Sequence, residues 1–174
     1  AYDSILGGHP DTNKVPGAEA STGSLGHGMP MALGMALGSK IKEINNKIYC
    51  LIGDGECNEG TIWESALLAS HHKLSNFCCI VDYNHSTDRA LNIGDLVSKF
   101  ESFGWTAILA DGHNHNELKK NFLLPATRPT VIICETIKGF GIDRMENEPA
   151  WHHRSPNDQE LKEMLEELHE KTIS

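Results

Sequence analysis

The sequence of 174 residues lacks a cluster of basic residues, a long apolar run and a paired-cysteine motif. Its 15 Lys and Arg residues stand against 24 Asp and Glu residues, a formal net charge of −9. Nucleic-acid-binding proteins need a basic surface to neutralise phosphates, so we expect no nucleic-acid partner. No apolar stretch approaches the roughly 20 residues of a membrane span and no signal peptide is evident, so we expect no membrane insertion and a cytoplasmic location.

The five cysteines form neither a metal-binding nor a disulfide pattern. None belongs to a C-x-x-C pair, and four lie inside apolar, strand-like runs. A zinc site or a disulfide framework is therefore a poor interpretation, and we expect reduced, structural thiols. The cysteines are Cys50, Cys57, Cys78, Cys79 and Cys134.

Four short runs rich in Ile, Val and Cys predict β-strands. They are continuously apolar rather than alternating, which is typical of parallel strands covered on both faces. The length suits one domain over residues 1–174. The predicted strands are residues 47–52, 77–83, 106–110 and 130–136.

Helical patterns lie between these runs and give the order β-α-β-α-β-α-β. We therefore expect an α/β fold, with a doubly wound, mainly parallel sheet and helices on both faces. A small-residue helix is also expected before the first strand. The predicted helices are residues 23–41, 61–74, 95–103 and 114–123.

Two further segments follow the last predicted strand. Residues 138–157 show no periodic pattern, and a loop of this length in a compact domain is usually functional or mobile. Residues 157–171 predict an amphipathic helix with Asn157 or Asp158 as the N-cap. Its expected buried stripe is Leu161, Met164, Leu165 and Leu168.

Polar residues end the first two predicted strands. In doubly wound sheets ligands bind beyond the carboxyl ends of the strands. The first strand runs into "GDGECNEG" (53–60) and the second ends in Asp82-Tyr83-Asn84. If the two strands are neighbours, their ends lie about 5 Å apart, and Asp54 and Asn84 can share one cation. These oxygen ligands suit Mg²⁺ or Ca²⁺, whose remaining positions would go to water and phosphate oxygens.

Gly-Asp-Gly is also a common turn, and that interpretation stays open on this motif alone. Two nucleotide-binding loops are excluded. The dinucleotide motif G-x-G-x-x-G fails because residue 58 is Asn, and the G-K-[ST] of a P-loop is absent.

The pair of a G-D-G and an Asn about one βαβ unit later resembles the thiamine diphosphate motif. Further segments occur in the order found in transketolases, and together they cover nearly the whole chain. They are "GHP" (8–10), "PGAEASTGSLGHG" (16–28), "GDGECNEG" (53–60), "VDYN" (81–84), "GW" (104–105), "DGH" (111–113), "TIKGFG" (136–141) and "MENEPAWHHRSPND" (145–158). The chain thus resembles the diphosphate-binding domain of a transketolase, especially the separate amino-terminal subunit type.

The resemblance implies a function for this chain together with a partner. Thiamine diphosphate and Mg²⁺ would be the cofactors, and a two-carbon ketol unit would pass from a ketose to an aldose or its phosphate. The partner would be a pyrimidine-binding, carboxy-terminal subunit or domain, in a homodimer or a heterotetramer. The resemblance also implies an upstream segment ahead of "GHP", with two further histidines, which this sequence does not contain.

The resemblance also implies roles for individual residues. Mg²⁺ would be held by Asp54, Asn84 and the main-chain carbonyl of Ser86. His9 and His152 would be catalytic, and Glu59 would lie at the subunit interface. The expected cofactor contacts are Gly23, Ser24, Leu25, Gly55, Asn84 and His152.

The other histidines are expected mainly at the surface or in loops. His27 is open between packing and cofactor contact, and Lys138 is open between a phosphate contact and a solvated loop. The histidines with the surface interpretation are His71, His72, His85, His113, His115 and His169.

One departure from the family concerns the stretch after Asn84. The family usually has an apolar residue and then an Asp-Gly turn, whereas this chain has "HSTDRALNIG" (85–94). Another thiamine diphosphate-dependent carboligase or decarboxylase therefore remains an alternative. A non-catalytic subunit that keeps the fold is a second alternative.

Overall fold

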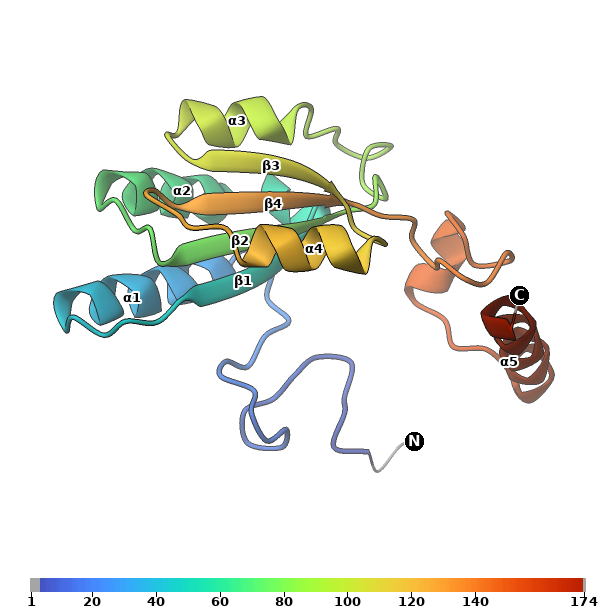
Figure 1. Ribbon diagram of the computed structural model, residues 1–174. Coiled ribbons are helices and arrows are strands. Elements are labelled where there is room, and N and C mark those ends of the chain that lie inside the picture. Colours follow the sequence, from blue (N-terminus) through green and yellow to red (C-terminus); the bar gives the residue numbers. More distant parts are fainter. Residues whose placement is uncertain (1–3, 174) are drawn as a thin grey trace.

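The predicted strands form one parallel sheet in the order β1-β2-β4-β3 (Figure 1). The computed structural model describes residues 4–173. The strands are β1 (Ile48–Gly53), β2 (Phe77–Tyr83), β3 (Thr106–Asp111) and β4 (Thr130–Glu135). The predicted α/β class and the parallel sheet are confirmed.

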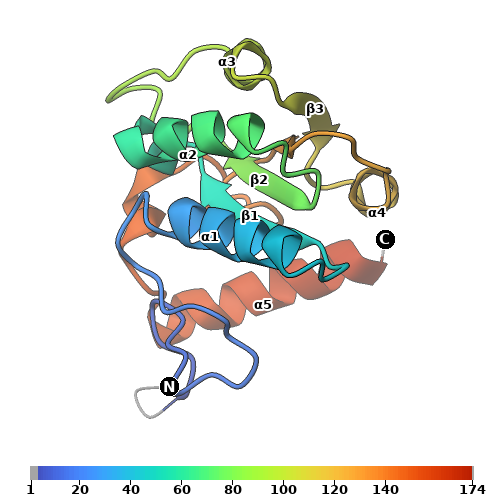
Figure 2. The same ribbon diagram turned by 90° about the vertical axis from the view of Figure 1, so that its left-hand side faces the viewer.

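Helices α1, α2 and α3 cover one face of the sheet, and α4 lies on the other face (Figure 2). The predicted helices between the strands are therefore confirmed to within a few residues. Within residues 4–173 no helix is both long enough and apolar enough to cross a bilayer. The helices are α1 (Gly28–Ile41), α2 (Gly60–His71), α3 (Leu96–Ser102), α4 (His115–Phe122) and α5 (Asp158–Ile173), with short 3-10 helices η1 (Gly55–Asn58) and η2 (Pro149–His152).

The larger hydrophobic core lies between the sheet and the three helices on its first face. Trp105 is at its centre and packs edge to face against Phe77 and Phe100, with ring centroids 5.5 and 5.4 Å away. Its indole N–H donates to the carbonyl of Ala66 in α2 at 2.8 Å. Each fully buried aromatic of this kind contributes about 2 to 3 kcal/mol to stability, so this cluster ties α2 and α3 to the sheet.

The core on the second face is smaller and lies under α4. Leu118 and Phe122 of α4 pack against Ile132 and its neighbours on β2, β3 and β4. Helix α4 does not reach over β1, the strand at one edge of the sheet. Tyr49 and Leu51 on β1 consequently remain 46% and 69% exposed.

Helix α1 begins at Gly28, five residues later than the sequence predicts. The reason is backbone conformation: Gly23 has φ +129° and Gly26 has φ +79°. Both values are incompatible with a right-handed helix. Residues 23–27 therefore form a turn that leads into the helix.

All five cysteine thiols are buried and free. Burial raises the pKa of Cys50 to about 11 and that of Cys57 to about 12, with nearby acidic groups adding to the effect. Burial also raises the pKa of Cys78 to about 11 and that of Cys79 well above its usual range. These thiols stay protonated at neutral pH, so they are poor nucleophiles and poor metal ligands.

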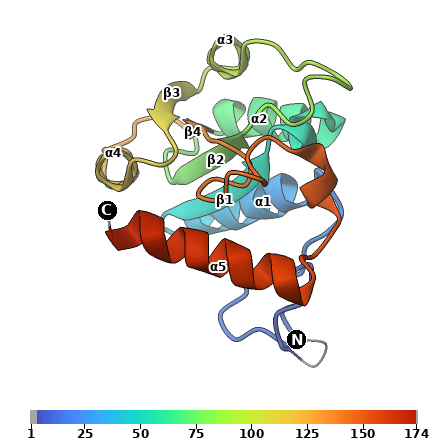
Figure 3. The ribbon, with the colours of Figure 1, turned by 90° about the vertical axis from the view of Figure 1, so that its right-hand side faces the viewer.

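Helix α5 lies beyond the carboxyl ends of the strands rather than against either face of the sheet (Figures 1 and 3). The predicted buried stripe is wrong for most of its members. Met164 is buried at 3%, but Leu161, Leu165 and Leu168 are 45%, 56% and 37% exposed. An amphipathic pattern shows which face of a helix is apolar, but it does not show that a neighbouring element covers that face.

Candidate active site

The ends of β1 and β2 lie side by side, as the two polar strand ends require. Gly53 pairs with Asp82 in the parallel register. The backbone N–H of Asp54 then donates to the carbonyl of Asp82 at 3.0 Å. This pairing brings the segments that carry Asp54 and Asn84 to the same edge of the sheet.

Asp54 is a buried carboxylate with one unpartnered oxygen. Its exposed fraction is 3%. Oδ1 accepts the N–H of Gly55 at 2.7 Å, whereas Oδ2 is buried and has no hydrogen-bond partner within residues 4–173. Burial raises the pKa of Asp54, against the lowering effect of the Gly55 N–H, and the negative charges of Asp82 and Asp88 raise it further. A buried carboxylate in this state needs a cation or a proton.

Asn84 is held in one orientation by Asp82, a residue that the sequence analysis did not select. The side-chain N–H of Asn84 donates to Oδ2 of Asp82 at 3.1 Å, and its Oδ1 accepts the N–H of Ser86 at 3.0 Å. The other oxygen of Asp82 accepts the hydroxyl of Thr136 after β4. The D-x-N spacing could have revealed this role, because residues i and i+2 of a strand lie on the same face.

A cavity of about 400 Å³ opens at these strand ends and has two walls. Its lining includes one arginine, one lysine and three histidines, but no aspartate or glutamate. In a chain of net charge −9 this composition favours a phosphate-bearing ligand. The lining residues are Asn84, His85, Ser86, Thr87 and Arg89 from the loop after β2, and Lys138, Asn147, Pro149, His152 and His153 from the segment after β4.

His152 and Lys138 meet on the second wall of this cavity. Nζ of Lys138 lies 3.0 Å from Nδ1 of His152. The ammonium charge of Lys138 lowers the pKa of His152, with smaller contributions from desolvation and from His153. The contact puts Lys138 at the site, where the sequence left its role open, and it favours a neutral imidazole at His152.

The first loop brings His9 and Gly23 together. A Cβ atom on Gly23 would lie only 2.9 Å from Cδ2 of His9, so the imidazole rests directly on this glycine. Leu25 is 57% exposed, and Oγ of Ser24 lies 3.2 Å from Nδ1 of His27. These residues are not among those that line the 400 Å³ cavity.

The turn at Gly26 connects this first loop to the segment after Asp54. The N–H of Gly26 donates to Oε1 of Glu56 at 2.8 Å, and the hydroxyl of Thr61 donates to the Gly26 carbonyl at 2.7 Å. A Cβ atom at residue 26 would lie 2.5 Å from Oγ1 of Thr61 and 2.7 Å from Cβ of Glu59. Glu59 itself is exposed. Glycine at 26 therefore allows the two predicted groups of site residues to approach each other.

Gly55 faces the loop after β2. A Cβ atom at this position would lie 2.6 Å from Cγ2 of Thr87. Its N–H, which the sequence assigned to a diphosphate, donates to the carboxylate of Asp54 in this structure.

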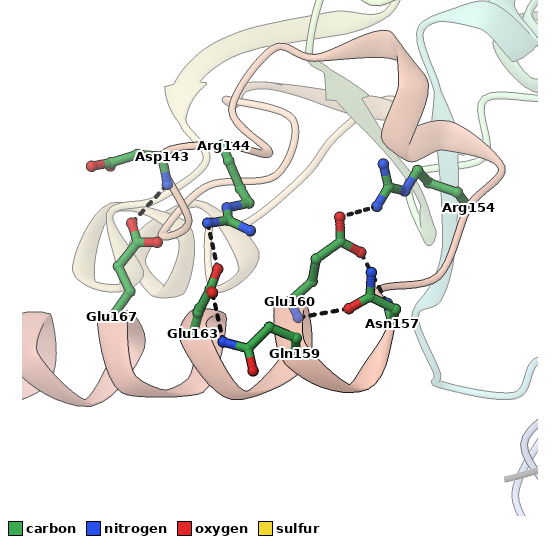
Figure 4. Close-up of polar contacts among 8 residues, drawn as sticks. All are labelled: Asp143, Arg144, Arg154, Asn157, Gln159, Glu160, Glu163 and Glu167. Carbon is green, nitrogen blue, oxygen red and sulfur yellow. Dashed lines mark hydrogen bonds and ion pairs between the residues drawn. The ribbon is translucent and has the colours of Figure 1, made fainter.

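The segment that carries Lys138 and His152 is attached to α5 by polar contacts (Figure 4). The N–H of Asp143 donates to Glu167 and the guanidinium of Arg144 donates to Glu163, both at 2.8 Å. Lys171 contacts Asp143 at 2.5 Å. Helix α5 starts with a capping box, in which Asn157 and Glu160 exchange side-chain to backbone hydrogen bonds of 2.9 Å. Asn157 is therefore the N-cap.

Known proteins share this sequence and fold. The sequence profile of the family described as "Transketolase, thiamine diphosphate binding domain" matches residues 1–171. One of the two subunits named for apulose-4-phosphate transketolase, from Actinobacillus succinogenes, is 40% identical over 173 residues, which are 95% of this chain and 63% of that protein. Human transketolase is 38% identical over 172 residues, which are 95% of this chain and 27% of that protein.

Among solved structures, transketolase from Campylobacter jejuni superposes with a TM-score of 0.87 and 31% identity. The match covers 96% of this chain and 28% of that one. This chain therefore corresponds to one part of each of these longer proteins.

Proposed function

Because the chain belongs to the family of transketolase thiamine diphosphate-binding domains, we propose that it binds thiamine diphosphate with Mg²⁺ and serves ketol transfer together with a partner. The observation that carries this proposal is the unpartnered, buried Oδ2 of Asp54 at the paired ends of β1 and β2. Beside it, Asp82 fixes the amide of Asn84.

The donor set at these strand ends fits Mg²⁺. Asp54 supplies a carboxylate oxygen, Asn84 an amide oxygen and Ser86 a main-chain carbonyl. All are hard oxygen ligands, and they are few enough to leave positions for water and for phosphate oxygens of the cofactor. The cation would also neutralise Asp54, which burial otherwise penalises.

Thiamine diphosphate, when bound, supplies the carbanion that adds to a carbonyl carbon of the sugar. The protein residues have separate tasks. Lys138 and His152 face the phosphates across the cavity, and Gly55 keeps the backbone near Thr87 open to them. Gly23, Ser24 and Leu25 would contact the ring portion of the cofactor.

Proton transfer to and from sugar hydroxyls is assigned to His9 and His152. The lowered pKa of His152 keeps its imidazole neutral at pH 7, so that it can accept a proton. His9, held flat on Gly23, is the second candidate.

The relatives named for apulose-4-phosphate transketolase are longer than this chain, and each is named as one subunit of its enzyme, which implies another. We infer a pyrimidine-binding partner subunit, in a heterotetramer or with a homodimer as the core, and place Glu59 at that interface. Apulose 4-phosphate in the relatives' name, together with the basic cavity, favours phosphorylated sugars as substrates.

Isothermal titration calorimetry tests cofactor binding directly. The chain should bind thiamine diphosphate in the presence of Mg²⁺, and Asp54→Ala should lose at least about tenfold in affinity, since it removes the carboxylate at the metal. Asp111→Ala, at the end of β3, is the matched control and should bind normally. Equal affinity of Asp54→Ala and the unaltered chain would reject the metal assignment.

Ketol transfer needs the partner. A candidate pyrimidine-binding protein is added to the chain, and release of aldehyde product from a ketose phosphate is followed. Activity should require both polypeptides. Cofactor binding without any transfer, over a panel of phosphorylated ketoses and partners, would favour the non-catalytic alternative.

A further inference from the structure

His85 adopts a backbone conformation that most residues avoid. Its φ is +60°, in the left-handed region where glycine is usual and other residues are uncommon. The ring of His85 stacks on Tyr83, with centroids 4.1 Å apart. A non-glycine residue held in this region next to a cavity is a reason to look for a function of the side chain.

Asp88 fixes the ring of His85 in place. Oδ2 of Asp88 lies 3.0 Å from Nδ1 of His85. Oδ1 of Asp88 is buried and has no hydrogen-bond partner in the part of the chain that the structure describes. With Nδ1 engaged, Nε2 is the ring nitrogen left for a ligand, and His85 is one of the residues that line the cavity.

Arg89 lies on the same wall, one residue after Asp88. No hydrogen bond or ion pair engages its guanidinium within residues 4–173. Lys138 and His152 occupy the opposite wall. Basic side chains therefore face the cavity from both the loop after β2 and the segment after β4.

A phosphate group matches this arrangement. Its oxygens accept from a guanidinium in a bidentate geometry. Near neutral pH a phosphate monoester exists with and without its second proton, so it can bind an imidazole nitrogen as donor or as acceptor.

We propose that His85 and Arg89, with Asp88 as the positioning residue for His85, form a phosphate-binding wall of this cavity. The inference rests on the proposed function. The phosphate belongs either to the cofactor or to a phosphorylated sugar, and the experiment separates the two sources.

Calorimetric titrations of the whole chain use two probes, thiamine diphosphate with Mg²⁺ and ribose 5-phosphate. The variants are His85→Asn, since asparagine tolerates positive φ, and Arg89→Gln. The matched controls are His71→Asn at the end of α2 and Arg128→Gln in the exposed loop before β4. Each test variant should lose about tenfold in affinity for at least one probe, the effect of one hydrogen bond to a charged group, and the controls should lose none.

The pattern of loss identifies the source. Weaker binding of thiamine diphosphate alone assigns the wall to the cofactor, and weaker binding of ribose 5-phosphate alone assigns it to the substrate. Unchanged affinity for both probes in both variants overturns the inference, even if Asp54→Ala abolishes cofactor binding as the proposed function requires. No binding of either probe by the unaltered chain overturns both.

A double-mutant cycle tests the positioning role of Asp88. Asp88→Asn should weaken phosphate binding in the unaltered chain and have no further effect in the His85→Asn background. Independent, additive losses would show that Asp88 acts without His85 and would overturn this part of the proposal.

Discussion

At the scale of single residues, Asp54 sets function against stability. Its pKa is raised by burial, so the folded state holds the proton more tightly than the unfolded state does. The stabilising contribution of the neutral carboxyl group is present below the ordinary Asp range and is lost as the pH rises through the raised pKa. Without a cation, an ionised Asp54 therefore destabilises the fold at pH 7.

Replacing Asp54 with asparagine should raise the thermal midpoint of the cation-free chain at pH 7. Removal of a buried, incompletely paired charge worth about 1 kcal/mol corresponds to about 2 to 4 °C for a domain of this size. Added Mg²⁺ should raise the midpoint of the unaltered chain and leave that of Asp54→Asn unchanged, because only the unaltered chain binds the ion. Differential scanning calorimetry with and without Mg²⁺ measures both effects. A midpoint for Asp54→Asn below that of the cation-free parent would contradict this account.

Lys138 controls the protonation of His152. Because the ammonium group is the main cause of the lowered pKa, Lys138→Met should raise the pKa of His152 toward its ordinary value. Titration of the His152 ring protons by NMR measures this shift. Lys73→Met, in the turn after α2, is the control and should leave the titration unchanged. An unaltered His152 titration in Lys138→Met would mean that the 3.0 Å contact is not maintained in solution.

The site shows how far residue patterns reach. Asp54 and Asn84 are predictable because strand ends can be recognised from apolar runs that stop at polar residues. The contacts of Thr136 with Asp82 and of Lys138 with His152 are not, since they join segments whose proximity depends on the pairing of β2 with β4.

At the scale of secondary-structure elements, the strands were predictable from sequence and the packing of α5 was not. Central parallel strands are apolar on both faces, and this pattern survives without knowledge of their neighbours. The Leu and Met stripe of α5 also predicts a helix correctly, but only Met164 is buried. The polar contacts that hold α5 depend on tertiary structure, so sequence periodicity could not reveal them.

Lys171 should be important for the attachment of α5 to the segment after β4. It contacts Asp143 at 2.5 Å and Glu167 at 2.7 Å, and Glu167 accepts the backbone N–H of Asp143. Lys171→Met should accelerate hydrogen exchange at the Asp143 amide several-fold, since exposed ion pairs contribute only up to about 1 kcal/mol. The control is Lys162→Met, whose exposed contact with Glu166 is 4.0 Å long. Equal exchange rates at Asp143 in the two variants would show that α5 is held by other contacts.

At the scale of the whole molecule, the uncovered part of the second sheet face should cause self-association. Helix α4 leaves Tyr49 and Leu51 exposed on β1, a strand that pairs only with β2. Exposed edge strands with apolar side chains favour contacts between chains.

The change Leu51→Lys should reduce self-association of the isolated chain, because it places a charge on this face. Sedimentation velocity over a range of protein concentrations measures the effect, and Leu67→Lys, an exposed position on α2, is the control. Stability should change by less than about 0.5 kcal/mol, since the side chain is 69% exposed. Association that persists equally in both variants would place the contact surface elsewhere.

The buried thiols provide an internal timer for opening of the fold. Cys50, Cys57 and Cys79 lie in the core on one side of the sheet, and Cys78 and Cys134 lie in the core on the other. An alkylating reagent can reach each sulfur only while the layer above it is detached. Mass spectra taken at intervals would show all five labels appearing together if the two layers separate in one event, and two successive groups of labels if the helix over the smaller core detaches first.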